Sequence, residues 1–192
     1  ITTGNLEDDL KEIKSCDWVI EVVVERLDIK KSLFEKVEQY RTPGTLISSN
    51  TSGIPIHLMA EGRSADFQAH FLGTHFFNPP RYLRLLEIIP TALTRKEVVD
   101  FFMQFGDIYL GKRTVKCKDT PAFIANRIGV YAMSKIYQLS EELGLDINTV
   151  DKLTGPVMGR PNTGTFRLSD LVGLDTAVKV IEGIQQNCPE DE

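Results

Sequence analysis

The stretch that decides the fold is residues 73–80, Gly-Thr-His-Phe-Phe-Asn-Pro-Pro, which is followed by a second apolar run, Leu85–Pro90. A β-prone segment brings His75 to a point where the chain must turn, because proline fixes φ and disfavours helix in the residue before it. Glu87 stands inside the second run, and a buried carboxylate is costly unless it has a partner. A histidine paired with a carboxylate is a common general base with its orienting group. The alternative is a core histidine with satisfied hydrogen bonds and a surface glutamate on an edge strand.

The composition bounds the class of protein. The 192 residues are 42% hydrophobic and 26% charged, which is ordinary for a globular protein. A net charge of -5 predicts no nucleic-acid partner, and no apolar run approaches the roughly 18 residues of a membrane span. Three scattered histidines and the lack of a Cys-x-x-Cys pair argue against a metal site. The three cysteines lie far apart, which favours reduced thiols in a cytoplasmic protein.

A strand–helix–strand pattern opens the chain. Trp18–Val24 is an apolar run interrupted by a single glutamate, which is typical of a strand buried on both faces of a parallel sheet. Leu27–Tyr40 has apolar residues at helical spacing, and Thr45–Ser49 predicts the next strand. This order predicts a doubly wound α/β sheet. Because ligands bind beyond the carboxyl ends of such strands, Glu25 and Ser52 are candidate ligand contacts.

Two polar residues near these strand ends, Lys30 and Ser52, can be explained with or without a ligand. Lys30 lies in the first turn of the predicted helix, where the helix dipole does not favour a cation. A ligand phosphate or ribose would explain its place, and the alternative is a solvated lysine. Ser52 could contact a ligand, or it could cap a short helix that starts near Pro55.

From Thr120 onward the sequence predicts only helices. Thr120 is a good N-cap and Pro121 suits the first helical position, so we expect a helix that ends near Leu143. Further helices are expected at Asp146–Thr154 and Ser169–Gln186. The chain is therefore expected to hold an α/β domain, residues 1–118, and an all-α domain, residues 119–192.

Five stretches, in this order, resemble the 3-hydroxyacyl-CoA dehydrogenase family. They are Glu21–Arg26, Ser48–Gly53, the segment His75–Pro79 with Glu87 beyond it, Lys118–Arg127 and Gly155–Pro161. Together they span nearly the whole chain. The resemblance implies NAD-dependent oxidation of an (S)-3-hydroxyacyl-CoA to a 3-ketoacyl-CoA, as in fatty-acid β-oxidation.

The resemblance also implies roles at the reacting end of the substrate. His75 matches the family's base, and Glu87 matches the carboxylate that orients it and stabilises the imidazolium. Ser52 matches a hydroxyl shared between substrate and cofactor. Asn78 and Asn126 match amides that hold the substrate, and we count Ser52 and Asn126 as catalytic too.

The implied cofactor is NAD, held in part by residues of this chain. Glu25 and Lys30 match positions at the nicotinamide ribose, and Ser52 and Asn78 match further cofactor contacts. The glycine-rich unit that binds pyrophosphate, Gly-x-Gly-x-x-Gly, does not occur. We therefore expect the second half of a Rossmann-like doubly wound sheet and a truncated helical domain, a fragment that is inactive by itself. The Trp18 strand should then lie at an unpaired edge.

Three interpretations of the protein's function and two association partners, a hydratase module and a second copy of the chain, remain open. The segment Pro80–Arg84 and the turn Gly159–Pro161 resemble long bacterial members in which an enoyl-CoA hydratase module is joined to the dehydrogenase. The Asn-Pro-Pro turn also resembles relatives that act on small 3-hydroxy acids. A module that serves association without chemistry is the third alternative. Apolar residues such as Ile128 and Leu153 exceed what a short bundle can bury, which predicts packing against a partner subunit, in a homo-oligomer, or against a missing helical segment.

Overall fold

The computed structural model describes residues 1–189, which divide into two compact units. Ile1–Phe123 forms one unit, here called the α/β unit, and the helical unit begins at Ile124. The organisation into an α/β part followed by helices is as predicted. The predicted boundary at residue 118 lies in the segment between the last strand and the end of the α/β unit.

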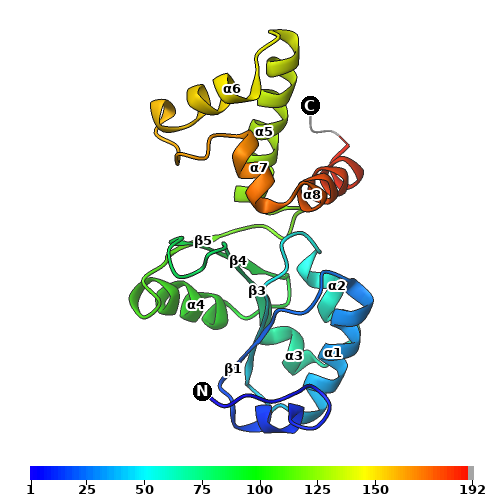
Figure 1. The fold of residues 1–192 in the computed structure, drawn as a ribbon. Coiled ribbons are helices and arrows are strands. Elements are labelled where there is room, and N and C mark those ends of the chain that lie inside the picture. Colours follow the sequence, from blue (N-terminus) through cyan, green and yellow to red (C-terminus); the bar gives the residue numbers. More distant parts are fainter. Residues whose placement is uncertain (190–192) are drawn as a thin grey trace. The chain divides into compact units, whose positions relative to one another are not determined.

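The α/β unit is built on a five-stranded sheet (Figure 1). The strands lie side by side in the order of the sequence: β1 (Trp18–Glu21), β2 (Leu46–Ser49), β3 (Phe71–Phe76), β4 (Leu85–Pro90) and β5 (Arg113–Lys116). β1, β2 and β3 are parallel, and β4 pairs in parallel with β5. β4 runs antiparallel to β3, because the chain returns directly through the turn after Phe76.

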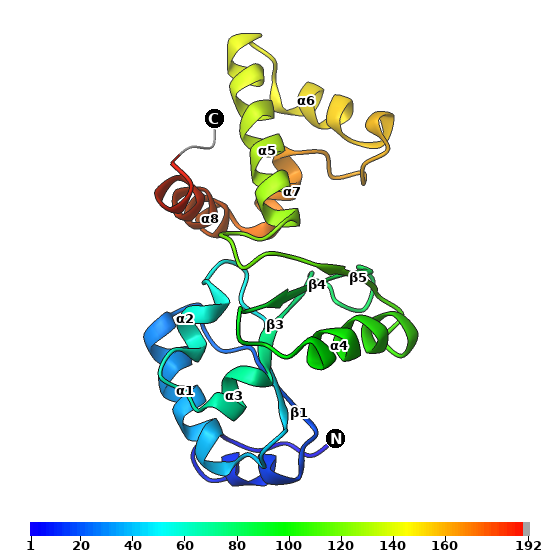
Figure 2. The ribbon, with the colours of Figure 1, turned by 180° about the vertical axis from the view of Figure 1, so that it is seen from behind.

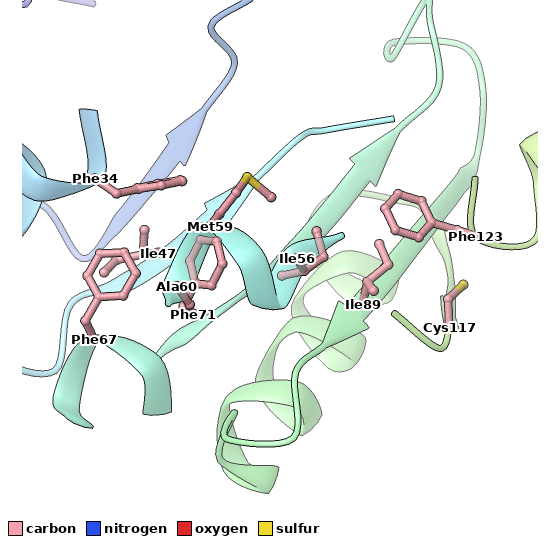
Figure 3. Close-up of a cluster of buried hydrophobic side chains, with 10 residues drawn as sticks. All are labelled: Phe34, Ile47, Ile56, Met59, Ala60, Phe67, Phe71, Ile89, Cys117 and Phe123. Atoms are coloured by element: carbon pink, nitrogen blue, oxygen red, sulfur yellow. The ribbon is translucent and has the colours of Figure 1, made fainter. Parts of the chain in front are cut away.

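Helices cover both faces of this sheet, as Figures 1 and 2 show together. They are α1 (Leu27–Tyr40), α2 (Ile56–Ala60), α3 (Ala65–Ala69) and α4 (Lys96–Ile108), while the 3-10 helix η1 (Leu10–Ser15) packs against α1. On the face of α1, α2 and α3, the rings of Phe34, Phe67 and Phe71 pack with centroids 5.1–5.6 Å apart (Figure 3). On the other face, Phe102 of α4 packs edge-on against Trp18 at 4.9 Å. The doubly wound arrangement is confirmed.

The first strand is shorter and more exposed than predicted. β1 ends at Glu21, and beyond it Val22 and Val24 are 70% and 58% exposed. The Glu21 carboxylate accepts the N–H of Val23 at 2.6 Å, which turns the chain out of the sheet. Among residues 1–189, β1 pairs with β2 alone, so this strand lies at the edge of the described sheet, as predicted.

The short helix α2 is held tightly against β3. A Cβ on Gly73 would lie 2.7 Å from Ile56 Cδ1, so a larger residue at this position would have to displace the buried Ile56 side chain. Asp119, which follows β5, accepts the N–H groups of Ile56 and His57 at 2.7 and 2.9 Å. These bonds satisfy the start of α2 and fix the loop Asn50–Gly53 that leads into it.

The helical unit contains α5 (Ala125–Glu142), α6 (Ile147–Thr154), the 3-10 turn η2 (Pro156–Met158), α7 (Phe166–Val172) and α8 (Leu174–Asn187). The predicted helix that ends at Thr154 is confirmed, and the Asp146 side chain caps it by accepting the N–H of Thr149. Among residues 1–189, none of the helices is both long enough and apolar enough to cross a bilayer.

Two predicted helix boundaries in this region are wrong. The helix expected from Thr120 begins only at Ala125, because Ala122 and Phe123 have φ of 59° and 51° and leave the right-handed helical region. The helix expected over Ser169–Gln186 is divided at Gly173, whose φ is 98°. Both breaks come from backbone conformation, which apolar periodicity does not report.

The described part of the helical unit buries hydroxyl groups in places where apolar side chains are common. Thr165 donates to the Thr154 hydroxyl at 2.9 Å, and the hydroxyls of Tyr137 and Ser169 pair with one another. Several large apolar side chains are instead more than half exposed: Ile128, Tyr131, Leu139, Leu143, Ile147, Leu153, Leu171 and Leu174. This unit therefore presents apolar surface that its own described residues do not cover.

Candidate active site

The pairing of β3 with β4 brings a histidine and a carboxylate face to face. In the antiparallel register His75 stands opposite Glu87, and Nδ1 of the ring lies 2.8 Å from Oε2 of the carboxylate. The side chains are only 4% and 1% exposed. The alternative of a surface glutamate on an edge strand is therefore wrong.

Two phenylalanines enclose the His75 ring. The ring centroid lies 4.4 Å from that of Phe77 and 5.6 Å from that of Phe123. When Glu87 is ionised, Nδ1 carries the proton and donates it to the carboxylate, so Nε2 keeps a lone pair. The pair can then take up a proton at Nε2 while the carboxylate stabilises the imidazolium.

A thiol lies beside this pair, which the sequence analysis did not select. Burial and the adjacent Glu87 carboxylate raise the pKa of Cys117 to about 12. The thiol is therefore protonated at neutral pH, and a protonated buried thiol is a weak nucleophile. The signal in the sequence was slight, because Cys117 looks like an ordinary inward-facing position after β5.

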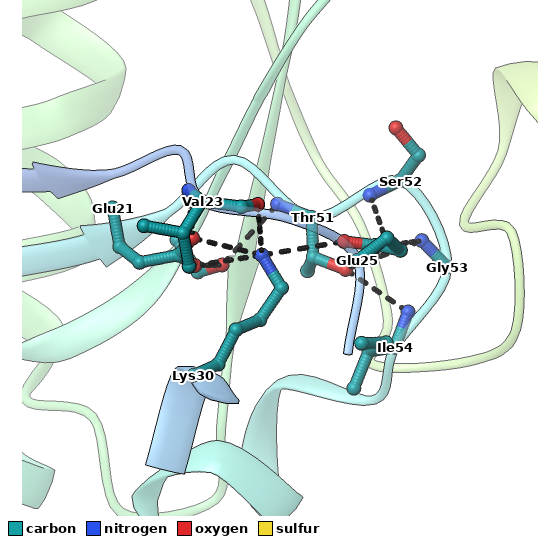
Figure 4. Close-up of polar contacts among 9 residues, drawn as sticks. Glu21, Val23, Glu25, Lys30, Thr51, Ser52, Gly53 and Ile54 are labelled. Atoms are coloured by element: carbon teal, nitrogen blue, oxygen red, sulfur yellow. Dashed lines mark hydrogen bonds and ion pairs between the residues drawn. The ribbon is translucent and has the colours of Figure 1, made fainter. Parts of the chain in front are cut away.

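The loop after β2 folds around the carboxylate of Glu25 (Figure 4). Oε1 of Glu25 accepts the hydroxyl of Thr51 at 2.5 Å and the N–H groups of Ser52 and Gly53 at 3.0 and 3.2 Å. The side chain of Glu25 is nevertheless 46% exposed. It is a carboxylate fixed in direction by the protein and still accessible to a ligand.

Lys30 has partners for its charge within the protein. Its Nζ lies 2.8 and 2.9 Å from the two carboxylate oxygens of Glu21 and 3.3 Å from Oε2 of Glu25, and its side chain is 1% exposed. The argument that this cation needs a ligand is therefore wrong, although a role at the cofactor stays a prediction. Sequence reasoning missed Glu21 as a functional candidate, and its signal was a lone glutamate inside an apolar strand.

The strand of His75 is joined to the loop of Ser52 by one side chain. Asn50 Oδ1 accepts the N–H of Phe76 at 2.8 Å. Below it, the Thr74 hydroxyl donates to Ser48 at 2.8 Å. These bonds hold the ends of β2 and β3 together, so that the loop and the histidine keep a constant separation.

Three other candidate residues occupy more open or separate positions. Ser52 is exposed, and Figure 4 shows its hydroxyl directed away from Glu25. It does not cap α2, whose N-cap position is Pro55. Asn78 is exposed in the turn after β3, and Asn126 lies in the first turn of α5 in the helical unit. Their contacts with a ligand remain predictions.

The arrangement supports proton transfer beside a bound ligand that carries hydroxyl groups. Because β1, β2 and β3 are parallel, their carboxyl ends lie together at the same end of the sheet. That end carries an oriented histidine, the accessible carboxylate of Glu25 and the hydroxyl of Ser52. Within residues 1–189, no group of three His, Cys, Asp or Glu side chains is placed to hold a metal ion.

Comparison with protein families identifies both parts of the chain. Residues 1–120 match the family described as 3-hydroxyacyl-CoA dehydrogenase, NAD binding domain. Residues 123–192 match the family described as 3-hydroxyacyl-CoA dehydrogenase, C-terminal domain. The two matches leave only the link before α5 unassigned.

Individual relatives agree with these matches. A probable 3-hydroxyacyl-CoA dehydrogenase of Bacillus subtilis is 53% identical over 192 residues, which are 100% of this chain and 24% of that protein. A putative fatty acid oxidation complex trifunctional enzyme of Rickettsia felis is 40% identical over all of this chain and 27% of its own length. The crystal structure of (S)-3-hydroxybutyryl-CoA dehydrogenase from Ralstonia eutropha is 28% identical with a TM-score of 0.85, and the match covers 93% of this chain and 62% of that one. The chain thus spans about a quarter of the length of these two curated relatives.

Proposed function

Because the chain belongs to the 3-hydroxyacyl-CoA dehydrogenase family, we propose that the protein that carries it oxidises an (S)-3-hydroxyacyl-CoA to a 3-ketoacyl-CoA with NAD. The observation that carries this proposal is the buried His75–Glu87 pair, joined at 2.8 Å beside the Ser52 loop. We assign the reaction to fatty-acid β-oxidation. The three free cysteines support a reducing, cytoplasmic compartment.

The α/β unit offers groups that fit the nicotinamide ribose of NAD. The half-exposed Glu25 carboxylate can accept hydrogen bonds from a diol, and its Oε1 is already oriented by the loop. Ser52 and Asn78 would supply further contacts. Lys30 would act through its ion pair with Oε2 of Glu25. When bound, NAD supplies the acceptor for the hydride that leaves C3 of the substrate.

The proton of the 3-hydroxyl goes to His75 in this mechanism. Nε2 removes it as the C3–H bond breaks, and Glu87 stabilises the imidazolium through Nδ1. Ser52 and Asn126 are proposed to hold the hydroxyl and the thioester end of the substrate. Proton transfer by a positioned base contributes roughly 10²–10⁴ in rate. We therefore expect mutation of His75 to lower the rate more than mutation of any other residue of the site.

The test is the reverse reaction with acetoacetyl-CoA and NADH. In the protein that carries this chain, His75→Gln should lower kcat by about 10²-fold or more, because the base acts in the transition state. His70→Gln is the matched control, since that histidine also bonds through Nδ1, to the Asp66 carbonyl at 2.7 Å, but belongs to no candidate site. The control should keep its kcat.

Other outcomes identify the alternatives. Wild-type turnover of small 3-ketoacids, without turnover of acetoacetyl-CoA, would indicate a dehydrogenase of small 3-hydroxy acids. No turnover of either substrate would indicate an association module. Near-wild-type kcat in His75→Gln would contradict the assignment of the base while leaving the substrate class intact.

We also propose two associations. The exposed apolar side chains of α5 and α6, among them Ile128, Leu139 and Leu153, support self-association into a homo-oligomer. The trifunctional relative supports a further module, which we propose to be an enoyl-CoA hydratase, fused or associated. Sedimentation of the protein that carries this chain tests the first proposal, and a monomer with these side chains covered would contradict it.

A further inference from the structure

The mechanism proposed above does not use the buried carboxylate of Glu21 at the end of β1. Glu21 is 3% exposed, and three donor groups make four hydrogen bonds to its carboxylate. Val23 N–H lies at 2.6 Å, the Ser49 hydroxyl at 2.5 Å, and Lys30 Nζ at 2.8 and 2.9 Å from its two oxygens. A carboxylate is costly to bury, and this one is fully satisfied as an anion.

Lys30 links this buried carboxylate to the accessible one. Its ammonium lies closer to Glu21, at 2.8 Å, than to Glu25, at 3.3 Å, and it also donates to the carbonyl of Val23 at 3.2 Å (Figure 4). The two carboxylates and one ammonium sum to a single negative charge. Because Glu21 neutralises the lysine, the negative charge that remains belongs to the exposed partner, Glu25.

We propose that Glu21 is a positioning residue for the cofactor, acting through Lys30 on Glu25. By holding the ammonium at the buried end, Glu21 leaves Oε2 of Glu25 open to a ribose hydroxyl while Lys30 still fixes its direction. The inference rests on the proposed function, because it takes the ligand of Glu25 to be NAD. It adds a residue that makes no ligand contact and still sets the affinity.

Removing the charge of Glu21 should move the ammonium onto Glu25. Lys30 would then bind both oxygens of that carboxylate and compete with the ribose. In the acetoacetyl-CoA assay, Glu21→Gln should raise KM for NADH about tenfold, the scale of one hydrogen bond to a charged group. Because ground-state and transition-state binding are lost together, kcat should stay within about threefold.

Two further variants separate positioning from stability. Glu21→Asp keeps the charge, so its KM for NADH should stay within about twofold of wild type even though its packing is altered. Asp66→Asn is the matched control, because Asp66 pairs at 2.6 Å with Arg41, a cation whose side chain is 4% exposed and which follows the opposite end of α1. It should lower the thermal midpoint without changing KM for NADH.

A double variant covers the case in which Glu21→Gln does not fold. Glu21→Gln/Lys30→Met replaces the buried ion pair by neutral side chains of similar size, which proteins often tolerate. Oε2 of Glu25 then has no partner to orient it, so KM for NADH should rise at least about threefold. An unchanged KM in the double variant, or equal KM changes in Glu21→Gln and Asp66→Asn, would overturn the inference. An inactive wild type would instead contradict the proposed function.

Discussion

Two buried pairs of polar side chains in the α/β unit have opposite consequences. His75–Glu87 joins neighbouring strands, and its ring has a nitrogen that the carboxylate does not use. Glu21–Lys30 joins a strand to a helix, and four hydrogen bonds from three donor groups occupy the carboxylate of Glu21. Both pairs are almost fully buried. The first can exchange a proton with a ligand, whereas the second keeps fixed charges in place.

The difference comes from the ionisable groups rather than from burial. The imidazole of His75 keeps Nε2 available to accept a proton while Nδ1 stays bonded to Glu87. The ammonium of Lys30 carries donors only and has no lone pair to offer a ligand. We therefore expect variants of the two pairs to act on different measurements, one on turnover and the other on stability and affinity.

The largest expected effect is on stability. Lys30→Met leaves Glu21 buried without a cation and should lower the free energy of unfolding by about 3–5 kcal/mol. Urea denaturation of the protein that carries this chain measures it. Lys96→Met is the control, because Lys96 and its partner Asp100 are exposed, and the midpoint should change little. Equal losses in the two variants would remove the distinction between a buried and an exposed pair.

Glu87→Gln should act on turnover. The substitution keeps the shape of the side chain and removes the charge that stabilises the imidazolium, so kcat should fall by roughly 10²-fold. KM for acetoacetyl-CoA should stay near wild type, because Glu87 does not contact the substrate in our proposal. A change confined to KM would instead make Glu87 a binding residue.

The smallest expected effect concerns the thiol beside Glu87. Because burial and Glu87 raise the pKa of Cys117 from 9.0 to about 12, the unfolded chain releases this proton at a lower pH than the folded protein. The contribution of Cys117 to stability is therefore complete below pH 9 and is lost as pH rises toward 12. Urea midpoints at pH 8 and pH 10 should differ less in Cys117→Ala than in wild type. Identical alkaline losses would show that the thiol titrates normally.

The spacing of apolar residues along the chain correctly predicted elements that bury one face against neighbouring parts of the sequence. The helix Leu27–Tyr40 was predicted at its observed ends, because apolar residues recur along it at helical spacing. The same reasoning extended β1 to Val24, and the capping signals of Thr120 and Pro121 placed a helix start too early. Both predictions failed because an edge position and the left-handed residues Ala122 and Phe123 depend on neighbours and backbone angles, which a one-dimensional pattern does not contain.

The sequence by itself determined the fold class and the two-part organisation, because alternating strands and helices leave few ways to arrange these runs. Spacing alone left the pairing of His75 with Glu87 open, and only the resemblance to a family favoured it. Tertiary structure alone decided which charges meet. Nine positions separate Glu21 from Lys30 and 26 separate Glu25 from Thr51. Spacing along the chain does not predict such contacts, because a strand, a helix and a loop must first pack together. A carboxylate that becomes buried in this packing is then stable only with hydrogen-bond donors beside it.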